Sequence, residues 1–134
     1  MHYDRIKDFN QPLAGAVITR LLAVRSQLST RLGAALRHAT YLLGRVAGAS
    51  GRVLLLTDGR PRDIDIHDSN YLVDDARRAV QDAARRQVLV QCLALDRGAL
   101  PTLERVIGGG QVAHLKTLAA LPATLASLAC NAQR

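Results

Sequence analysis

The residues best suited to chemistry in this sequence are aspartates that follow an apolar run. Val53 to Leu56 lead directly into Thr57, Asp58 and Gly59. The unbroken apolar run predicts a strand of a parallel sheet with both faces covered. In open α/β sheets, ligands bind at the carboxyl ends of the strands. Asp58 is therefore a candidate metal ligand or acid/base group, and a strand-end aspartate that closes the following turn is the equally weighted alternative.

More aspartates follow in the acidic loop 58–70. Asp63, Asp65 and Asp68 stand close together, and clustered carboxylates attract cations. The spacing does not fit an EF-hand, because glycine and glutamate are missing where that loop requires them. A solvated acidic loop explains the same residues. One alternative function follows from them: a metal-dependent hydrolase or phosphotransferase that uses Asp58, Asp63 and Asp65.

Other candidate groups have structural explanations. Thr30 follows Ser29 at the predicted start of a helix, where either residue would act as an N-cap. The four histidines lack metal-ligand spacing, and Cys92 lies inside an apolar run, as a core residue would. Phosphate-loop and nucleophile-elbow motifs are absent. The sequence specifies no catalytic residue, so we expect a protein that is not an enzyme.

Elements that position these residues follow from hydrophobic periodicity. Helices alternate with apolar strands, which predicts an α/β fold with a mostly parallel sheet flanked by helices. The predicted elements are a weak strand 3–9, a helix opened by Pro12 with apolar residues at 13, 17, 18, 21, 24 and 28, a helix from Ser29–Thr30 to Gly48, a strand 53–57, a helix 71–86, a strand 88–95, a helix 100–107, a strand 112–115 and a last helix from Pro122.

Composition narrows the class of protein. The 134 residues suit one domain, and 49% are hydrophobic, which allows a core but includes no membrane-spanning run. The N-terminus has no signal-peptide pattern, so we expect a cytoplasmic protein. A net charge of +7 suggests nucleic-acid binding as one hypothesis. Arginines spread over several helices with few aromatic residues favour solvated helix faces over an acidic protein partner or nucleic acid, so no nucleic-acid or membrane partner is expected.

Together, these residues resemble a von Willebrand factor A domain. Ser29 to Ala39 is similar to the threonine segment of the family's metal site and the helix that follows it, and Leu54 to Pro61 is similar to its Thr-Asp-Gly segment. The runs Asp63 to Asp68 and Tyr71 to Arg77 are similar in sequence to the CbbO/NorD subgroup of this family, and they are closer to its CbbO branch. The resemblance covers nearly all of 1–134.

This resemblance implies a three-layer, Rossmann-like fold and a non-catalytic interaction module. Family members hold Mg²⁺ at the carboxyl edge of the sheet with an Asp-x-Ser-x-Ser segment, a threonine and an aspartate. Here Thr30 would be the threonine and Asp58 the aspartate, both of them hard oxygen ligands. The implied partners are a MoxR-type AAA+ ATPase (CbbQ/NorQ-like) and its client enzyme, with Rubisco favoured over nitric oxide reductase.

One departure from the family changes these expectations. No Asp-x-Ser-x-Ser occurs in 1–134, and the sequence corresponds to a domain that starts near its third strand, with the first strands missing. We therefore expect weak or absent Mg²⁺ binding by this chain alone, and a sheet with unpaired edges and exposed apolar faces. The chain would then be the C-terminal part of a longer adaptor, with its missing strands supplied by another chain. The alternative is a truncated fragment without function.

Overall fold

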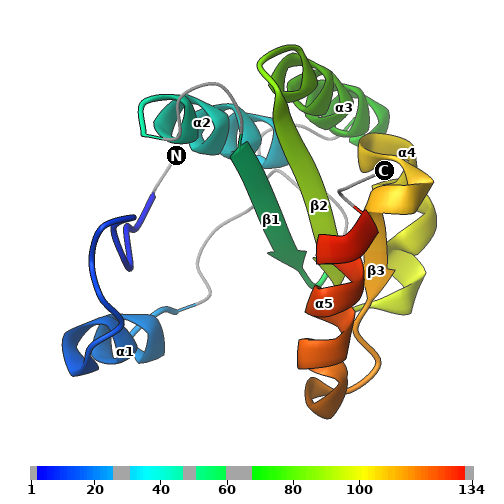
Figure 1. Ribbon diagram of the computed structural model, residues 1–134. Coiled ribbons are helices and arrows are strands. Elements are labelled where there is room, and N and C mark those ends of the chain that lie inside the picture. The colour runs from blue at the N-terminus through cyan, green and yellow to red at the C-terminus, as the bar shows by residue number, and fades with distance from the viewer. Residues whose placement is uncertain (1–2, 26–30, 47–50, 60–67, 132–134) are drawn as a thin grey trace.

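A computed structural model describes residues 3–25, 31–46, 51–59 and 68–131 of the chain (Figure 1). The described part is an α/β structure built on a short parallel sheet. Its elements in chain order are α1 (Gly15–Leu22), α2 (Leu32–Gly44), β1 (Gly51–Thr57), α3 (Ser69–Arg85), β2 (Val88–Ala94), η1 (Arg97–Ala99), α4 (Leu100–Ile107), η2 (Gly109–Gln111), β3 (Val112–His114), η3 (Leu118–Ala120) and α5 (Leu121–Asn131).

The strands lie in the order β1-β2-β3, and both pairs are parallel. β1 pairs with β2 along its whole length, from Gly51 opposite Val88 to Thr57 opposite Ala94. Helices α2, α3 and α4 pack on one face of the sheet, and α5 lies on the other face beside β2 and β3 (Figure 1). These layers confirm the expected α/β class with a parallel sheet flanked by helices.

β2 is the central strand, and it is buried on both faces as its apolar sequence predicts. Val90 and Cys92 point into the main core, where Cys92 is fully buried. Gln91 points to the opposite face, and its amide nitrogen donates to the Leu128 carbonyl of α5 at 2.7 Å and to Gln111 Oε1 at 3.0 Å. These bonds satisfy a buried polar side chain and join α5 to the sheet.

β1 does not have the two covered faces that its apolar run predicts. Its odd-numbered residues, such as Val53 and Leu55, are half-buried against the core, but Leu54 is 46% and Leu56 60% exposed. The prediction failed because β1 is an edge strand here and α5 covers the neighbouring strands instead. The expectation of an unpaired edge and an exposed apolar face is confirmed for the described part of the chain.

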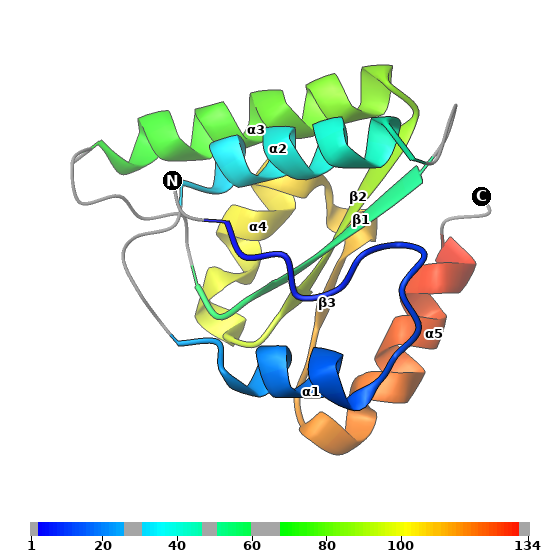
Figure 2. The ribbon, with the colours of Figure 1, turned by 90° about the vertical axis from the view of Figure 1, so that its left-hand side faces the viewer.

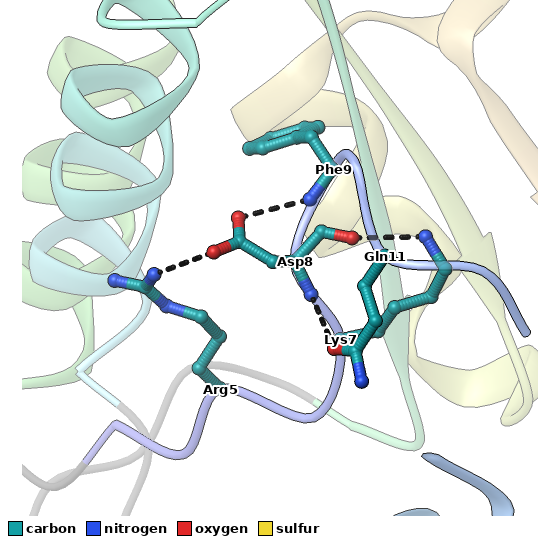
Figure 3. A network of polar contacts seen from close by, with 5 residues as sticks. All are labelled: Arg5, Lys7, Asp8, Phe9 and Gln11. Atoms are coloured by element: carbon teal, nitrogen blue, oxygen red, sulfur yellow. Dashed lines mark hydrogen bonds and ion pairs between the residues drawn. The ribbon is translucent and has the colours of Figure 1, made fainter. Parts of the chain in front are cut away.

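The weak strand expected at 3–9 is absent from the structure. These residues run without secondary structure into a turn at 9–10, and their polar groups bond locally (Figure 3). The Asp8 carboxylate accepts from Phe9 N–H at 2.9 Å and from Arg5 at 3.1 Å, while Gln11 N–H donates to the Asp8 carbonyl at 3.2 Å. The Phe9 N–H bond is the main reason that the pKa of the exposed Asp8 carboxyl is lowered. These local bonds use the backbone groups of Asp8, Phe9 and Gln11, so the end of the predicted strand is held as a turn.

The first helix also differs from the prediction. α1 begins at Gly15 rather than at Pro12, and Val17 is its one buried residue. Ile18 and Leu21 of the predicted apolar stripe are exposed, and Figure 1 shows α1 set apart from the three strands. The stripe is present in the sequence, but of its described members only Val17 is buried.

α2 and α3 pack closely side by side on the sheet. α2 ends at Gly44, earlier than the predicted Gly48, and α3 buries an apolar stripe made of Leu72, Ala76, Ala79 and Ala83. Gly33 lies against the backbone of Asp75, where an added Cβ would stand 3.1 Å from the Asp75 carbonyl carbon. Arg37 holds the Asp75 carboxylate at 2.6 Å, and this bond raises the arginine pKa. A small residue and an ion pair thus fix the distance between the two helices.

We predict that Gly33→Ala destabilises the protein, although alanine is the better helix former. The new methyl group would collide with an Asp75 side chain that Arg37 holds in place, and such overpacking costs about 1–3 kcal/mol. Gly44→Ala is the matched control in the same helix, because nothing lies within 4 Å of its Cβ position. Urea unfolding should show a lower midpoint for Gly33→Ala alone; equal midpoints would contradict the close packing.

Candidate functional site

The candidate site is the carboxyl edge of β1, where Thr57 is followed by Asp58 and Gly59. The Thr57 hydroxyl accepts from Gly59 N–H at 3.3 Å and donates to the Gly59 carbonyl at 3.2 Å. Threonine therefore closes the turn that the sequence alternative assigned to Asp58. The Asp58 side chain is exposed, and within the described residues its carboxylate accepts no hydrogen bond. It is available to a ligand or a partner.

The pairing of the sheet places a second aspartate at the same edge. Leu95 N–H donates to the Thr57 carbonyl at 2.9 Å, so Asp96 follows β2 just beyond the point where Asp58 follows β1. The Asp96 carboxylate is already used, since it accepts from Gly98 N–H at 3.0 Å and caps η1. Its strand-end position was visible in the sequence, but its capping role depends on the turn that follows.

The remaining candidates divide between two groups. Thr30, Asp63 and Asp65 lie outside the described residues, so the structure does not test the proposed ligand pair or the hydrolase alternative. Asp68 is described, and it is the N-cap of α3: one carboxylate oxygen accepts from Asn70 N–H at 2.9 Å and from Tyr71 N–H at 3.3 Å. This structural role explains Asp68 without a cation.

The described residues do not make a complete Mg²⁺ site. Asp58 supplies one carboxylate, and no group of three histidine, cysteine or acidic side chains comes together in the described ranges. Mg²⁺ prefers oxygen ligands and keeps several waters when one or two carboxylates bind it. Asp58 is suited to be one such ligand, but this single carboxylate falls short of a site, so we derive no chemistry through the ion.

The two cysteines differ in their environments. Cys130 is exposed, whereas Cys92 is fully buried in the core. Burial raises the pKa of the Cys92 thiol from 9.0 to about 11, because the thiolate would lose its solvation. Cys92 is therefore a neutral core residue at physiological pH, as its position in an apolar strand predicts.

The described helices are not of the kind that crosses a membrane. None of them combines the required length with sufficient apolar character. Within the described ranges, the fold and the site define an α/β protein with an open-edged parallel sheet and an exposed carboxylate at the end of its edge strand.

Comparison with known proteins gives relatives over most of the chain. A protein named NorD from Brucella suis biovar 1 is 35% identical over 125 residues, which are 93% of this chain and 20% of that protein. NorD from Stutzerimonas stutzeri is 37% identical over 111 residues, 83% of this chain and 18% of that protein. An uncharacterised protein of Pseudomonas aeruginosa is 33% identical over 123 residues. No family model matches the chain, and no solved structure does.

These relatives are much longer than this chain. The chain spans about one fifth of the length of the curated proteins that it matches. It is NorD-like over 93% of its own length. The similarity therefore concerns one part of such proteins.

We predict that loss of the Asp68 cap destabilises α3. Asp68→Ala removes the acceptor of two backbone N–H groups and should lower the unfolding free energy by about 1 kcal/mol. Asp68→Asn keeps an acceptor oxygen and should retain most of the stability. Asp74→Ala, on the exposed face of the same helix, is the control and should change stability little. Equal stability of Asp68→Ala and the control in urea unfolding would contradict the cap.

We also predict that one thiol reacts in the folded protein. Ellman's reagent at about pH 8 should modify the exposed Cys130 quickly. Cys92 should react only as the protein unfolds, because its thiol is buried and its pKa is about 11. Cys130→Ser should remove the fast phase. A fast phase that survives this substitution would show that the core around Cys92 opens readily.

Proposed function

We propose that the chain is a non-catalytic interaction module of a NorD-like accessory protein. The similarity to proteins named NorD over 93% of the chain carries this proposal. The site supports a role in contact as well, since the Asp58 carboxylate is exposed and accepts no hydrogen bond within the described residues. A free strand-end carboxylate is suited to contact with a partner or a cation.

The partner that we propose is a MoxR-type AAA+ ATPase, acting with the chain on a client enzyme. This step rests on the resemblance to the von Willebrand factor A domains of the CbbO/NorD subgroup. The sequence at 63–68 and 71–77 resembles the CbbO branch and favours Rubisco as the client, but the curated relatives carry the name NorD. We therefore propose two candidate client enzymes, nitric oxide reductase and Rubisco.

At this interface, Asp58 is the residue that we expect to matter most. With Thr30 it would contribute oxygen ligands to Mg²⁺, and the partner would complete the coordination with an acidic side chain. The exposed and unbonded state of the Asp58 carboxylate supports the proposal. The ligands that Asp58 lacks would come from the part of a NorD-like protein that this chain does not span.

We predict that Asp58→Asn weakens capture of a MoxR-type ATPase in excess Mg²⁺, when the immobilised protein is a NorD-like protein that contains this chain together with the segment that supplies the missing ligands. Loss of one charged ligand should lower the retained ATPase about tenfold. Asp96→Asn is the matched control, because it also changes a strand-end carboxylate at this edge but keeps an oxygen that caps η1. EDTA should have the same effect as Asp58→Asn. Capture that neither EDTA nor Asp58→Asn reduces would contradict the proposed metal contact, and no capture at all would contradict the partner.

A further inference from the structure

A hollow of about 470 Å³ lies between α2 and α3, which run side by side along the sheet (Figure 2). α2 contributes Arg37, Thr40 and Tyr41 to this α2–α3 hollow, at the i, i+3 and i+4 positions of one helix face. The residues of α3 and its end that line it are Ala79, Asp82, Ala83, Arg85 and Arg86. The two alanines are buried and small, so they leave space that longer side chains would fill.

Thr40 is the buried polar residue of the α2–α3 hollow. It is 5% exposed, and its Oγ1 is the one buried side-chain polar atom without a hydrogen-bond partner in the described part of the chain. A helical threonine often donates to the carbonyl four residues earlier, but this hydroxyl does not. An unmade hydrogen bond at a buried hydroxyl costs free energy. Because threonine populates two χ1 rotamers in helices, a turn about this bond offers the hydroxyl to an occupant of the hollow.

The charged groups of the hollow are mostly guanidinium groups. Arg37 is paired with Asp75 at 2.6 Å, and Arg85 is paired with Asp82 at 3.0 Å. Arg86 forms no ion pair or hydrogen bond with its side chain within the described residues. The bonds of Arg37 and Arg85 also use only part of the five N–H donors that each group has. The hollow therefore has an uncompensated positive charge and several free donors.

The end of α3 does not account for Arg86. Cations are favoured at the carboxyl end of a helix, where the last carbonyls lack partners. Here the Ala83 carbonyl accepts from Arg86 N–H and the Ala84 carbonyl accepts from Gln87 N–H, both at 2.9 Å. Backbone groups thus satisfy these carbonyls, and the guanidinium group of Arg86 is left for another acceptor.

The α2–α3 hollow is separate from the candidate site at Asp58. The ends of α2 and α3 lead into the amino ends of β1 and β2, whereas Asp58 follows the carboxyl end of β1. The two places lie toward opposite edges of the sheet, so a ligand of the hollow would not be a ligand of the Asp58 site.

We infer that the α2–α3 hollow binds a phosphate group, free or carried by a small molecule, with Arg86 and the Thr40 hydroxyl among its donors. Guanidinium groups bind phosphate through paired, charge-assisted hydrogen bonds. The tetrahedral oxygens of a phosphate accept from α2 and α3 at once, whereas the two oxygens of a carboxylate lie in one plane. A volume of about 470 Å³ is typical of small-molecule sites and exceeds what the phosphate alone would fill.

The test is a titration of the chain at constant ionic strength, followed by amide-resolved NMR. Inorganic phosphate should shift the amides of 37–41 and 79–86 along saturable curves, with a Kd of about 1 mM or lower. Acetate should give no saturable shift there. Glycerol 3-phosphate separates the two sources, because tighter binding than inorganic phosphate assigns a phosphorylated small molecule and weaker binding assigns the free anion. Shifts that do not saturate, or an equal response to acetate, would show only a general attraction to arginines and would overturn the inference.

A pair of arginine variants separates the site from the overall charge. Arg86→Ala should weaken phosphate binding about tenfold, because it removes the unpaired guanidinium group. Arg77→Ala is the matched control with the same change of charge. Arg77 is exposed and does not line the hollow, and helical spacing places it on the other side of α3. Equal weakening by both variants would contradict a defined site. Asp58→Asn should leave phosphate binding unchanged, so this outcome is independent of the ATPase capture.

The Thr40 hydroxyl has a test that distinguishes binding from stability. Thr40→Val removes a hydroxyl that has no partner in the folded chain, so the urea midpoint should stay the same or rise. Phosphate binding should nevertheless weaken several-fold, and Thr40→Ser, which keeps the hydroxyl, should retain it. Unchanged phosphate binding by Thr40→Val, or a lower midpoint, would contradict the assignment of this hydroxyl as a donor to the ligand.

Discussion

The parallel pairing of β1 with β2 is the interaction on which the rest of the structure depends. It runs over seven residues of each strand, from Gly51 opposite Val88 to Thr57 opposite Ala94. The register brings the ends of the two strands together, so Asp58 and Asp96 follow at one edge. It also divides the residues of β1 into two sets. The odd-numbered residues bond to β2 and face the core, and the even-numbered residues face outward in both backbone and side chain.

The helical layer holds this pairing in place from one side only. Gly33 allows α2 and α3 to approach closely, and the bond from Arg37 to Asp75 joins them at a charged position that is still partly in solvent. An exposed ion pair of this kind adds little stability, so the contact depends mainly on the small residue and the apolar surface beneath it. The opposite side has α5, joined to β2 through the buried Gln91 amide. β1 is therefore anchored by one layer, whereas β2 lies between two.

Sequence reasoning succeeded where a pattern is local, and it failed where burial depends on distant residues. The helix at 100–107, the strand β2 and the core position of Cys92 follow from periodicity and were confirmed. The apolar runs in β1 and α1 have the same character, but no described layer covers Leu56 or Leu21. An apolar pattern reports what a segment would bury if a partner surface were present. At the site, the strand-end position of Asp58 was predictable, whereas the closure of its turn by Thr57 depends on side-chain geometry that the pattern does not contain.

The distribution of charge connects the edge of the sheet with the overall composition. A net charge of +7 on the chain was attributed to solvated helix faces. Part of it has a more specific location, because Lys7, Arg45 and Arg52 line the hollow between the N-terminal segment, the end of α2 and β1, where Asp8 is paired with Arg5 at 3.1 Å. Cations at an open strand edge repel a second copy of the same edge and attract an acidic segment over a distance of about 10 Å at moderate salt. The charge therefore discourages self-association at the surface where the free backbone groups of β1 would otherwise promote it.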